Sequence, residues 1–216
     1  ESGADMFDAL KASLDIGTRQ ILFIQMTTEG EARTRTIPDR IRLTPTGWES
    51  PELKGMLVSA SEIQSRVREL ADEIQSQLPV DKPIVILPVL SGSFLFAADL
   101  VRHWRFACEL DFIGLSSYGA STQPGLIDWT HKLKTDIKDK HVLVIDDILD
   151  TGQTLDEIRK ELSKHHPTAI HTCVLLHKTL KTSGSTRFQA DYTGFKIPDH
   201  FVVGYGLDFA LKFRQL

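Results

Sequence analysis

Three acidic residues and a run of small residues lie within ten positions of one another in the second half of the chain. Asp146 and Asp147 follow the apolar, β-branched run 142–145, and Asp150 opens the segment Asp-Thr-Gly-Gln-Thr at 150–154. Two adjacent carboxylates suit the hydroxyls of a vicinal diol such as ribose, or a bound Mg²⁺ ion. A single Asp here would be interpreted as a turn or a helix cap. Three acids beside this loop instead indicate a ligand site.

The segment 150–154 has the composition of a phosphate-binding loop. The backbone N–H groups at the start of a helix attract anions. Gly152 lets the backbone approach a phosphate closely, and the hydroxyls of Thr151 and Thr154 can add donors. A phosphate, a diol and a metal ion together indicate a phosphorylated ribose.

The flanking elements should place these residues at one edge of a sheet. The run 142–145 predicts a buried parallel strand that ends at Asp146. Leu155, Ile158 and Leu162 then fall on one face of a helix, with acidic residues early and basic residues late. Ligands of open α/β sheets bind between a strand's carboxyl end and a helix N-terminus.

The rest of the chain from Ser59 onward alternates strands with helices. Strands are predicted over 84–90, 110–115, 168–176, 191–195 and 201–205, and helices from Ser59 or Ser61 and over 94–102. This alternation predicts an α/β fold with a parallel sheet. The polar segment 116–130 is too long for an ordinary connection, which favours a mobile lid, a long hairpin, or both. The turn Ser91-Gly92-Ser93 is a second potential anion site.

Residues 1–55 carry no motif and are predicted to be an N-terminal extension of unknown role, with the main domain over 56–216. Within the extension, residues 6–14 could form a helical stripe and residues 21–26 a strand. The extension could pack on the core or form a subunit contact. Fifty such residues would make a marginal core of their own.

Composition limits the class of protein. The chain has 216 residues, 41% hydrophobic and 25% charged, which is enough to bury one core. Its net charge of −4 argues against a nucleic-acid partner. Because it has neither a long apolar span nor a signal-peptide pattern, we expect a cytoplasmic protein without a membrane partner. Cys108 and Cys173 have no disulfide or metal spacing and are expected in the core.

The stretch 141–155 resembles the phosphoribosyl-pyrophosphate motif of type I phosphoribosyltransferases, which is a hydrophobic run, two acids, two apolar residues and Asp-Thr/Ser-Gly-x-Thr. The segments 89–100, 117–118 and 194–208 are similar, in the same order, to motifs of the hypoxanthine (guanine) members. The resemblance covers about 56–216. It implies a parallel-sheet core flanked by helices, a small C-terminal hood and a mobile lid loop.

The resemblance also implies an activity. Members transfer the 5-phosphoribosyl group from phosphoribosyl pyrophosphate to hypoxanthine or guanine, with Mg²⁺ as cofactor, and we expect a homodimer or homotetramer. A xanthine-preferring enzyme and a non-catalytic RNA-binding regulator with the same fold are alternatives, and the net charge gives the second no support. A receiver domain also pairs two acids, but on its first strand and without a phosphate loop.

Roles for the sugar-binding residues follow from the resemblance. Asp146 and Asp147 would hold the ribose hydroxyls and magnesium, and Asp208 a second magnesium. Asp150 would act near purine N7 as general base or acid. The 5′-phosphate would bind the loop that consists of Asp150, Thr151, Gly152, Gln153 and Thr154.

The resemblance assigns the purine and the lid as well. Lys178 would donate to the purine O6, and Phe201 would stack on the base. Val202 would bind the edge of the base through backbone atoms, and the surroundings of Val202 and Asp208 would read purine C2. Ser117 and Tyr118 would belong to the closing lid.

The pyrophosphate group would bind Ser91, Gly92 and Arg214. Here the chain departs from the family, which usually has a lysine where Ser91 stands. The pyrophosphate loop therefore lacks one positive charge.

Overall fold

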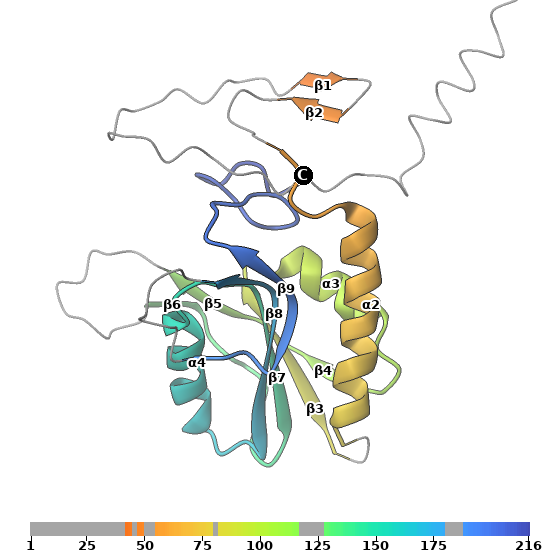
Figure 1. Cartoon of the computed structure of the whole chain (residues 1–216). Coiled ribbons are helices and arrows are strands. Elements are labelled where there is room, and N and C mark those ends of the chain that lie inside the picture. The colour runs from red at the N-terminus through yellow and green to blue at the C-terminus, as the bar shows by residue number, and fades with distance from the viewer. Residues whose placement is uncertain (1–41, 45–46, 50–54, 80–81, 117–127, 180–187) are drawn as a thin grey trace, which may run out of the picture.

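The computed structural model describes residues 42–44, 47–49, 55–79, 82–116, 128–179 and 188–216 (Figure 1). In chain order the elements are β1 (Arg42–Thr44), β2 (Gly47–Glu49), α2 (Ala60–Gln77), β3 (Ile84–Leu90), α3 (Phe94–Arg102), β4 (Glu109–Leu110), β5 (Ile113–Ser116), β6 (Asp128–His131), β7 (His141–Leu149), α4 (Gln153–Ser163), β8 (Ala169–Thr179) and β9 (Tyr192–Pro198). The helix and strand predicted at 6–14 and 21–26 lie outside the described residues. So do lid residues 117–127.

A seven-stranded sheet forms the centre, with the strand order β6-β5-β3-β7-β8-β9 and with β4 beside β3. Strands β3, β7, β8 and β9 run parallel, and only the pairing of β5 with β6 is antiparallel within this sheet. The predicted α/β fold with a mainly parallel sheet is confirmed. Separately, β1 and β2 pair as a short antiparallel ribbon.

Helices cover both faces of the sheet, with α2 and α3 on one side and α4 on the other (Figure 1). The alternation of side chains along β7 explains this arrangement. Leu143 and Ile145 pack in the core under α2 and α3. Val142 and Val144 pack in the core under α4. Because both faces are buried, β7 is apolar at every one of these positions.

Helix α2 begins at a capping box. The Ser59 hydroxyl accepts from the Glu62 backbone N–H at 3.3 Å, and the Glu62 carboxylate accepts from the Ser59 N–H at 2.8 Å. The predicted cap at Ser59 is confirmed. One face of α2 is buried against the sheet, and it includes Ile63, Val67, Leu70 and Ile74. None of the described helices is long and apolar enough to cross a membrane.

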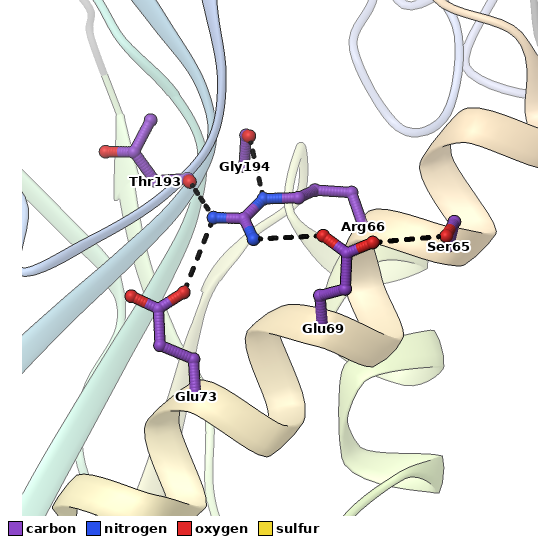
Figure 2. A network of polar contacts seen from close by, with 6 residues as sticks. All are labelled: Ser65, Arg66, Glu69, Glu73, Thr193 and Gly194. Atoms are coloured by element: carbon purple, nitrogen blue, oxygen red, sulfur yellow. Dashed lines mark hydrogen bonds and ion pairs between the residues drawn. The ribbon is translucent and has the colours of Figure 1, made fainter.

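Arg66 on α2 fastens the helix to β9, the last strand in the sheet order (Figure 2). Its guanidinium donates to the carbonyls of Thr193 at 2.9 Å and Gly194 at 3.0 Å, and it also pairs with Glu69 and Glu73. These bonds satisfy backbone carbonyls that would otherwise be open at the sheet edge.

The structure corrects the predictions for the strands at 110–115 and 142–145. The predicted strand 110–115 is divided into β4 and β5 at Asp111, whose carboxylate accepts N–H bonds from Phe112, Lys134 and Thr135. These local bonds compete with the ladder. The predicted end of β7 at Asp146 was too early, because Ile148 and Leu149 still pair with β8.

The predicted strand 201–205 was also wrong, because these residues form turns of the C-terminal hood (residues 199–216). Gly204 and Gly206 have φ of 101° and 104°, and Tyr205 has φ of 47°, which a strand does not allow. Their N–H groups bond within the hood instead, as when Tyr205 donates to the Leu216 carbonyl at 2.7 Å.

The two cysteines differ in burial. Cys173 lies on β8 and is buried as predicted. Cys108 is exposed, so its predicted core position was wrong. It lies in the connection between α3 and the short β4.

Candidate active site

A cleft of about 560 Å³ opens at the carboxyl ends of β3 and β7 and holds most of the predicted sugar-binding residues. Its lining comprises Val89, Leu90, Gly92, Leu115, Asp146, Asp147, Ile148, Leu149, Asp150, Thr151, Gly152, Gln153, Thr154 and Glu157. The fold thus brings together the acid pair, the phosphate loop and part of the pyrophosphate loop, as the sequence predicted.

Asp146 is a buried carboxylate beside a second one. Burial first, and then the charge of Asp147, raise the pKa of Asp146 well above its ordinary value. Burial also raises the pKa of Asp147, although the Arg214 charge acts in the opposite direction. Such a pair is stabilised by a cation or by hydroxyl donors placed against it.

The donor set fits a magnesium ion. Asp146 and Asp147 offer carboxylate oxygens, the ligands that Mg²⁺ prefers, and a cation would stabilise the ionised forms that burial disfavours at both residues. Within the described ranges, no group of three acidic, His or Cys side chains forms a ready metal site. The pair therefore suits an ion that keeps water or substrate oxygens as its other ligands.

The N-terminus of α4 lies directly after Asp150 and is open to an anion. Gly152 occupies the N-cap with φ of 80° and offers no capping side chain, and the Gln153 N–H donates to the Thr151 hydroxyl at 3.4 Å. A Cβ on Gly152 would lie 2.6 Å from the Cβ of Phe188, so only glycine fits. The residues that carry the first-turn N–H groups line the cleft, and only the long Thr151 contact caps one of these groups, which suits a phosphate.

Lys178, near the end of β8, lies between two carboxylates. Its ammonium donates to Asp150 at 2.9 Å and pairs with Asp199 at 3.1 Å. Burial alone would lower the pKa of Lys178, but the hydrogen bonds that its ammonium donates to these two acids outweigh burial and raise that pKa. Asp199 did not appear among the sequence-predicted residues. Only the register of β9 beside β8, with Lys178 opposite Ile197, brings it here.

The pyrophosphate loop, residues 90–93, packs between the acid pair and the hood. A Cβ on Gly92 would lie 1.8 Å from a carboxylate oxygen of Asp147. A Cβ on Gly206 would lie 2.0 Å from the Gly92 carbonyl oxygen. Both positions therefore require glycine, and Ser91, which directly precedes Gly92, is exposed.

Arg214 and Asp208, predicted for pyrophosphate and metal, contact each other. Their ion pair spans 2.7 Å, and the Arg214 guanidinium also donates to the Gly206 carbonyl. These contacts hold the chain end against the hood. A ligand that uses either residue must compete with this pair.

The predicted base-stacking residue, Phe201, is 38% exposed, and its neighbour Val202 is buried. Phe209 packs edge-on against Phe201, with ring centroids 5.8 Å apart and planes at 89°. One face of the Phe201 ring can therefore receive a planar base. The lid residues Ser117 and Tyr118 lie outside the described residues.

This arrangement of acid pair, phosphate loop and hood on an α/β sheet has a known counterpart. Residues 56–210 match the model of the phosphoribosyl transferase domain family. The chain therefore belongs to the phosphoribosyltransferase family.

Similar proteins within that family indicate which group of phosphoribosyltransferases the chain resembles. A hypoxanthine-guanine phosphoribosyltransferase of Aquifex aeolicus is 43% identical over 74% of this chain and 90% of its own length. A hypoxanthine-guanine-xanthine enzyme of Tritrichomonas foetus is 36% identical over 76% of this chain and 89% of its own. A solved hypoxanthine-guanine phosphoribosyltransferase of Bacillus anthracis matches with a TM-score of 0.69 at 40% identity, covering 76% of this chain and 95% of its own.

Proposed function

We infer that the chain is a purine-salvage enzyme that transfers the 5-phosphoribosyl group from phosphoribosyl pyrophosphate to hypoxanthine or guanine, giving the nucleoside 5′-monophosphate and pyrophosphate. The observation that carries this inference is the acid pair beside a helix N-terminus whose N-cap is a glycine, in a chain of this family. That combination matches the diol and phosphate of one sugar.

Binding of the sugar phosphate would use the N–H groups at the start of α4 and the carboxylates of the acid pair. The 5′-phosphate would accept N–H bonds from Thr151 to Thr154 at the start of α4. The ribose hydroxyls would donate to Asp146 and Asp147, whose raised pKa values reflect burial without enough donors. Magnesium, when bound beside this pair and Asp208, would neutralise negative charge on the leaving pyrophosphate.

The reaction breaks the bond from ribose C1 to pyrophosphate and forms one to a purine nitrogen. Positive charge develops on the sugar, which the acid pair would favour, and negative charge develops on the leaving group, which Arg214 would offset. Asp150 would hold or remove the proton at purine N7. Ser117 and Tyr118 are proposed to close over the site and exclude water, because water would hydrolyse the activated sugar.

Selection of a 6-oxopurine would depend on Lys178. An ammonium group can only donate, so it suits the O6 atom of hypoxanthine, guanine or xanthine and repels the 6-amino group of adenine. Phe201 would stack on the base and the Val202 backbone would bind its edge. Xanthine remains an alternative substrate, since purine C2 would be read by backbone near Val202 and Asp208.

An absorbance assay with each purine base, phosphoribosyl pyrophosphate and Mg²⁺ tests this function. We expect turnover of hypoxanthine or guanine, and adenine turnover lower by roughly 10²-fold or more. A preference for xanthine would select that alternative. No turnover of any 6-oxopurine would contradict the proposed function.

We further propose that the enzyme assembles as a homodimer or homotetramer and works in the cytoplasm. Residues 1–55 are proposed to be an extension outside the catalytic domain. Sedimentation equilibrium of the full chain and of a chain that begins at Met56 would test the assembly and the extension together.

A further inference from the structure

Asp150, Lys178 and Asp199 lie in a row at the carboxyl edge of the sheet. Each follows or ends one of three neighbouring strands, β7, β8 and β9. The middle residue carries the positive charge and is 12% exposed, whereas the two acids are about half exposed, at 49% and 55%. One ammonium is therefore shared by two carboxylates, of which only Asp150 has a role in the proposed reaction.

The proposed reaction asks Lys178 and Asp150 to separate. Purine O6 must accept from the ammonium, and Asp150 must turn to N7, so their 2.9 Å hydrogen bond has to lengthen or break. Without another carboxylate, Lys178 would lose its counter-charge when Asp150 leaves. Asp199, at 3.1 Å from the same nitrogen, can stay in place during that exchange.

The backbone around Asp199 is well held. The Thr179 hydroxyl on β8 donates to the Ile197 carbonyl at 3.0 Å, and the His200 N–H donates to the Pro198 carbonyl at 2.7 Å. Pro198 also fixes its own φ angle. The backbone on both sides of Asp199 is therefore held in place, and Asp199 precedes the proposed stacking residue Phe201 by two positions.

We propose that Asp199 is a positioning residue that retains the Lys178 ammonium when the purine displaces Asp150, so that O6 recognition and release of Asp150 occur together. The proposal rests on the proposed function, and it acts through Lys178 without contact between Asp199 and the base. Asp199 thereby sets how strongly a 6-oxo base competes with Asp150 for Lys178.

Kinetics of Asp199→Asn test the proposal, because this change keeps the shape of an exposed side chain. We expect KM for hypoxanthine or guanine to rise by roughly three- to tenfold, as for loss of a partly screened ion pair, with KM for phosphoribosyl pyrophosphate unchanged. Asp199→Glu should restore part of the loss. Asp72→Asn is the matched control, since Asp72 is a half-exposed acid paired with Arg105 elsewhere.

A double-variant cycle separates positioning from loop structure. In a Lys178→Met background, Asp199→Asn should change KM for the base by less than a factor of about 1.5, because its partner is gone. An equal effect in both backgrounds, or no effect on KM in the unmodified enzyme, would overturn the proposal.

A proton-exchange measurement, which needs no turnover, tests the role of Asp199 separately from the proposed function. The ¹⁵N-labelled ammonium of Lys178, assigned through its loss in Lys178→Met, should exchange protons with water at least several-fold faster in Asp199→Asn. An unmodified enzyme that turns over no base refutes the proposed function, and the exchange rate still decides whether Asp199 holds Lys178. An unchanged exchange rate refutes that hold.

Discussion

At the residue scale, the resting site is a set of unsatisfied or shared charges. Asp146 and Asp147 are adjacent acids whose pKa values are raised by burial. The single ammonium of Lys178 pairs with two acids. A substrate with hydroxyls, a phosphate and an oxo group supplies the partners that these side chains lack. The fold thus positions these charged side chains before the ligand binds, so they need to move little during the proposed reaction.

Asp150→Asn tests the proton-transfer role. Asparagine keeps the hydrogen-bonding shape but cannot take a proton at purine N7, so kcat should fall by roughly 10²- to 10⁴-fold. Binding of the nucleotide product, measured by calorimetry, should change much less. An unchanged kcat would reduce Asp150 to a loop cap and a partner of Lys178.

Asp146→Asn tests whether the buried, ionised carboxylate of Asp146 destabilises the fold. Because the pKa of Asp146 is raised in the fold, the folded chain keeps a proton to higher pH than the unfolded chain, and stability falls as pH rises through that window. At neutral pH the variant should therefore melt about 2–4 °C higher, as about 1 kcal/mol gives at this chain length. It should also lose affinity for the sugar phosphate.

Calorimetry of the ligand-free chain at pH 7 measures this shift. Asp136→Asn, at an exposed turn, is the control and should leave the melting temperature within about a degree. A lower melting temperature for Asp146→Asn would show that the carboxylate stabilises the fold, contrary to the direction of its pKa.

Sequence reasoning found the residues of the β7–α4 stretch but not Asp199. The first set is contiguous, so its spacing alone predicts a shared site. Asp199 reaches Lys178 through the pairing of β8 with β9 across about twenty residues, and no local pattern encodes that register. Edge-on packing of Phe209 against Phe201 was missed because the turns of the hood, which bring the two rings together, were not predicted.

At the element scale, local patterns predicted helices better than strands. The capping box and the apolar spacing fixed α2 closely, because both signals lie within the helix itself. The apolar run 201–205 indicated a strand, yet the Gly204 N–H donates to the Leu207 carbonyl and the Tyr205 N–H donates to the Leu216 carbonyl. Partners that are distant in sequence decide whether an apolar run joins a sheet.

The loop between β3 and α3 has Ser91 where the family usually has a lysine, and restoring that positive charge tests its effect on substrate binding. Ser91→Lys should lower KM for phosphoribosyl pyrophosphate several-fold, since attraction at a partly exposed site is on the order of 1 kcal/mol. The effect should shrink at high salt. Initial rates at two ionic strengths provide the measurement.

Ser91→Met is the matched control, because it lengthens the side chain without adding charge. Its KM for phosphoribosyl pyrophosphate should stay near that of the unmodified enzyme. A KM that does not move in Ser91→Lys, or that rises, would indicate that Arg214 and magnesium already satisfy the pyrophosphate.

At the scale of the whole molecule, the hood closes one side of the site against the sheet. The Tyr205 hydroxyl donates to Asp99 of α3 at 2.7 Å, and Gly206 lies against Gly92. The hood therefore contacts both α3 and the loop at residues 90–93. This contact positions the proposed base site beside the cleft that would hold the sugar.

A crystal structure with hypoxanthine mononucleotide tests most directly whether one site carries sugar, phosphate and base. The phosphate should accept N–H bonds from residues 151–154, the ribose hydroxyls should contact Asp146 and Asp147, and O6 should lie within hydrogen-bond distance of the Lys178 nitrogen. A nucleotide bound elsewhere, or one whose O6 faces away from Lys178, would contradict the central claim.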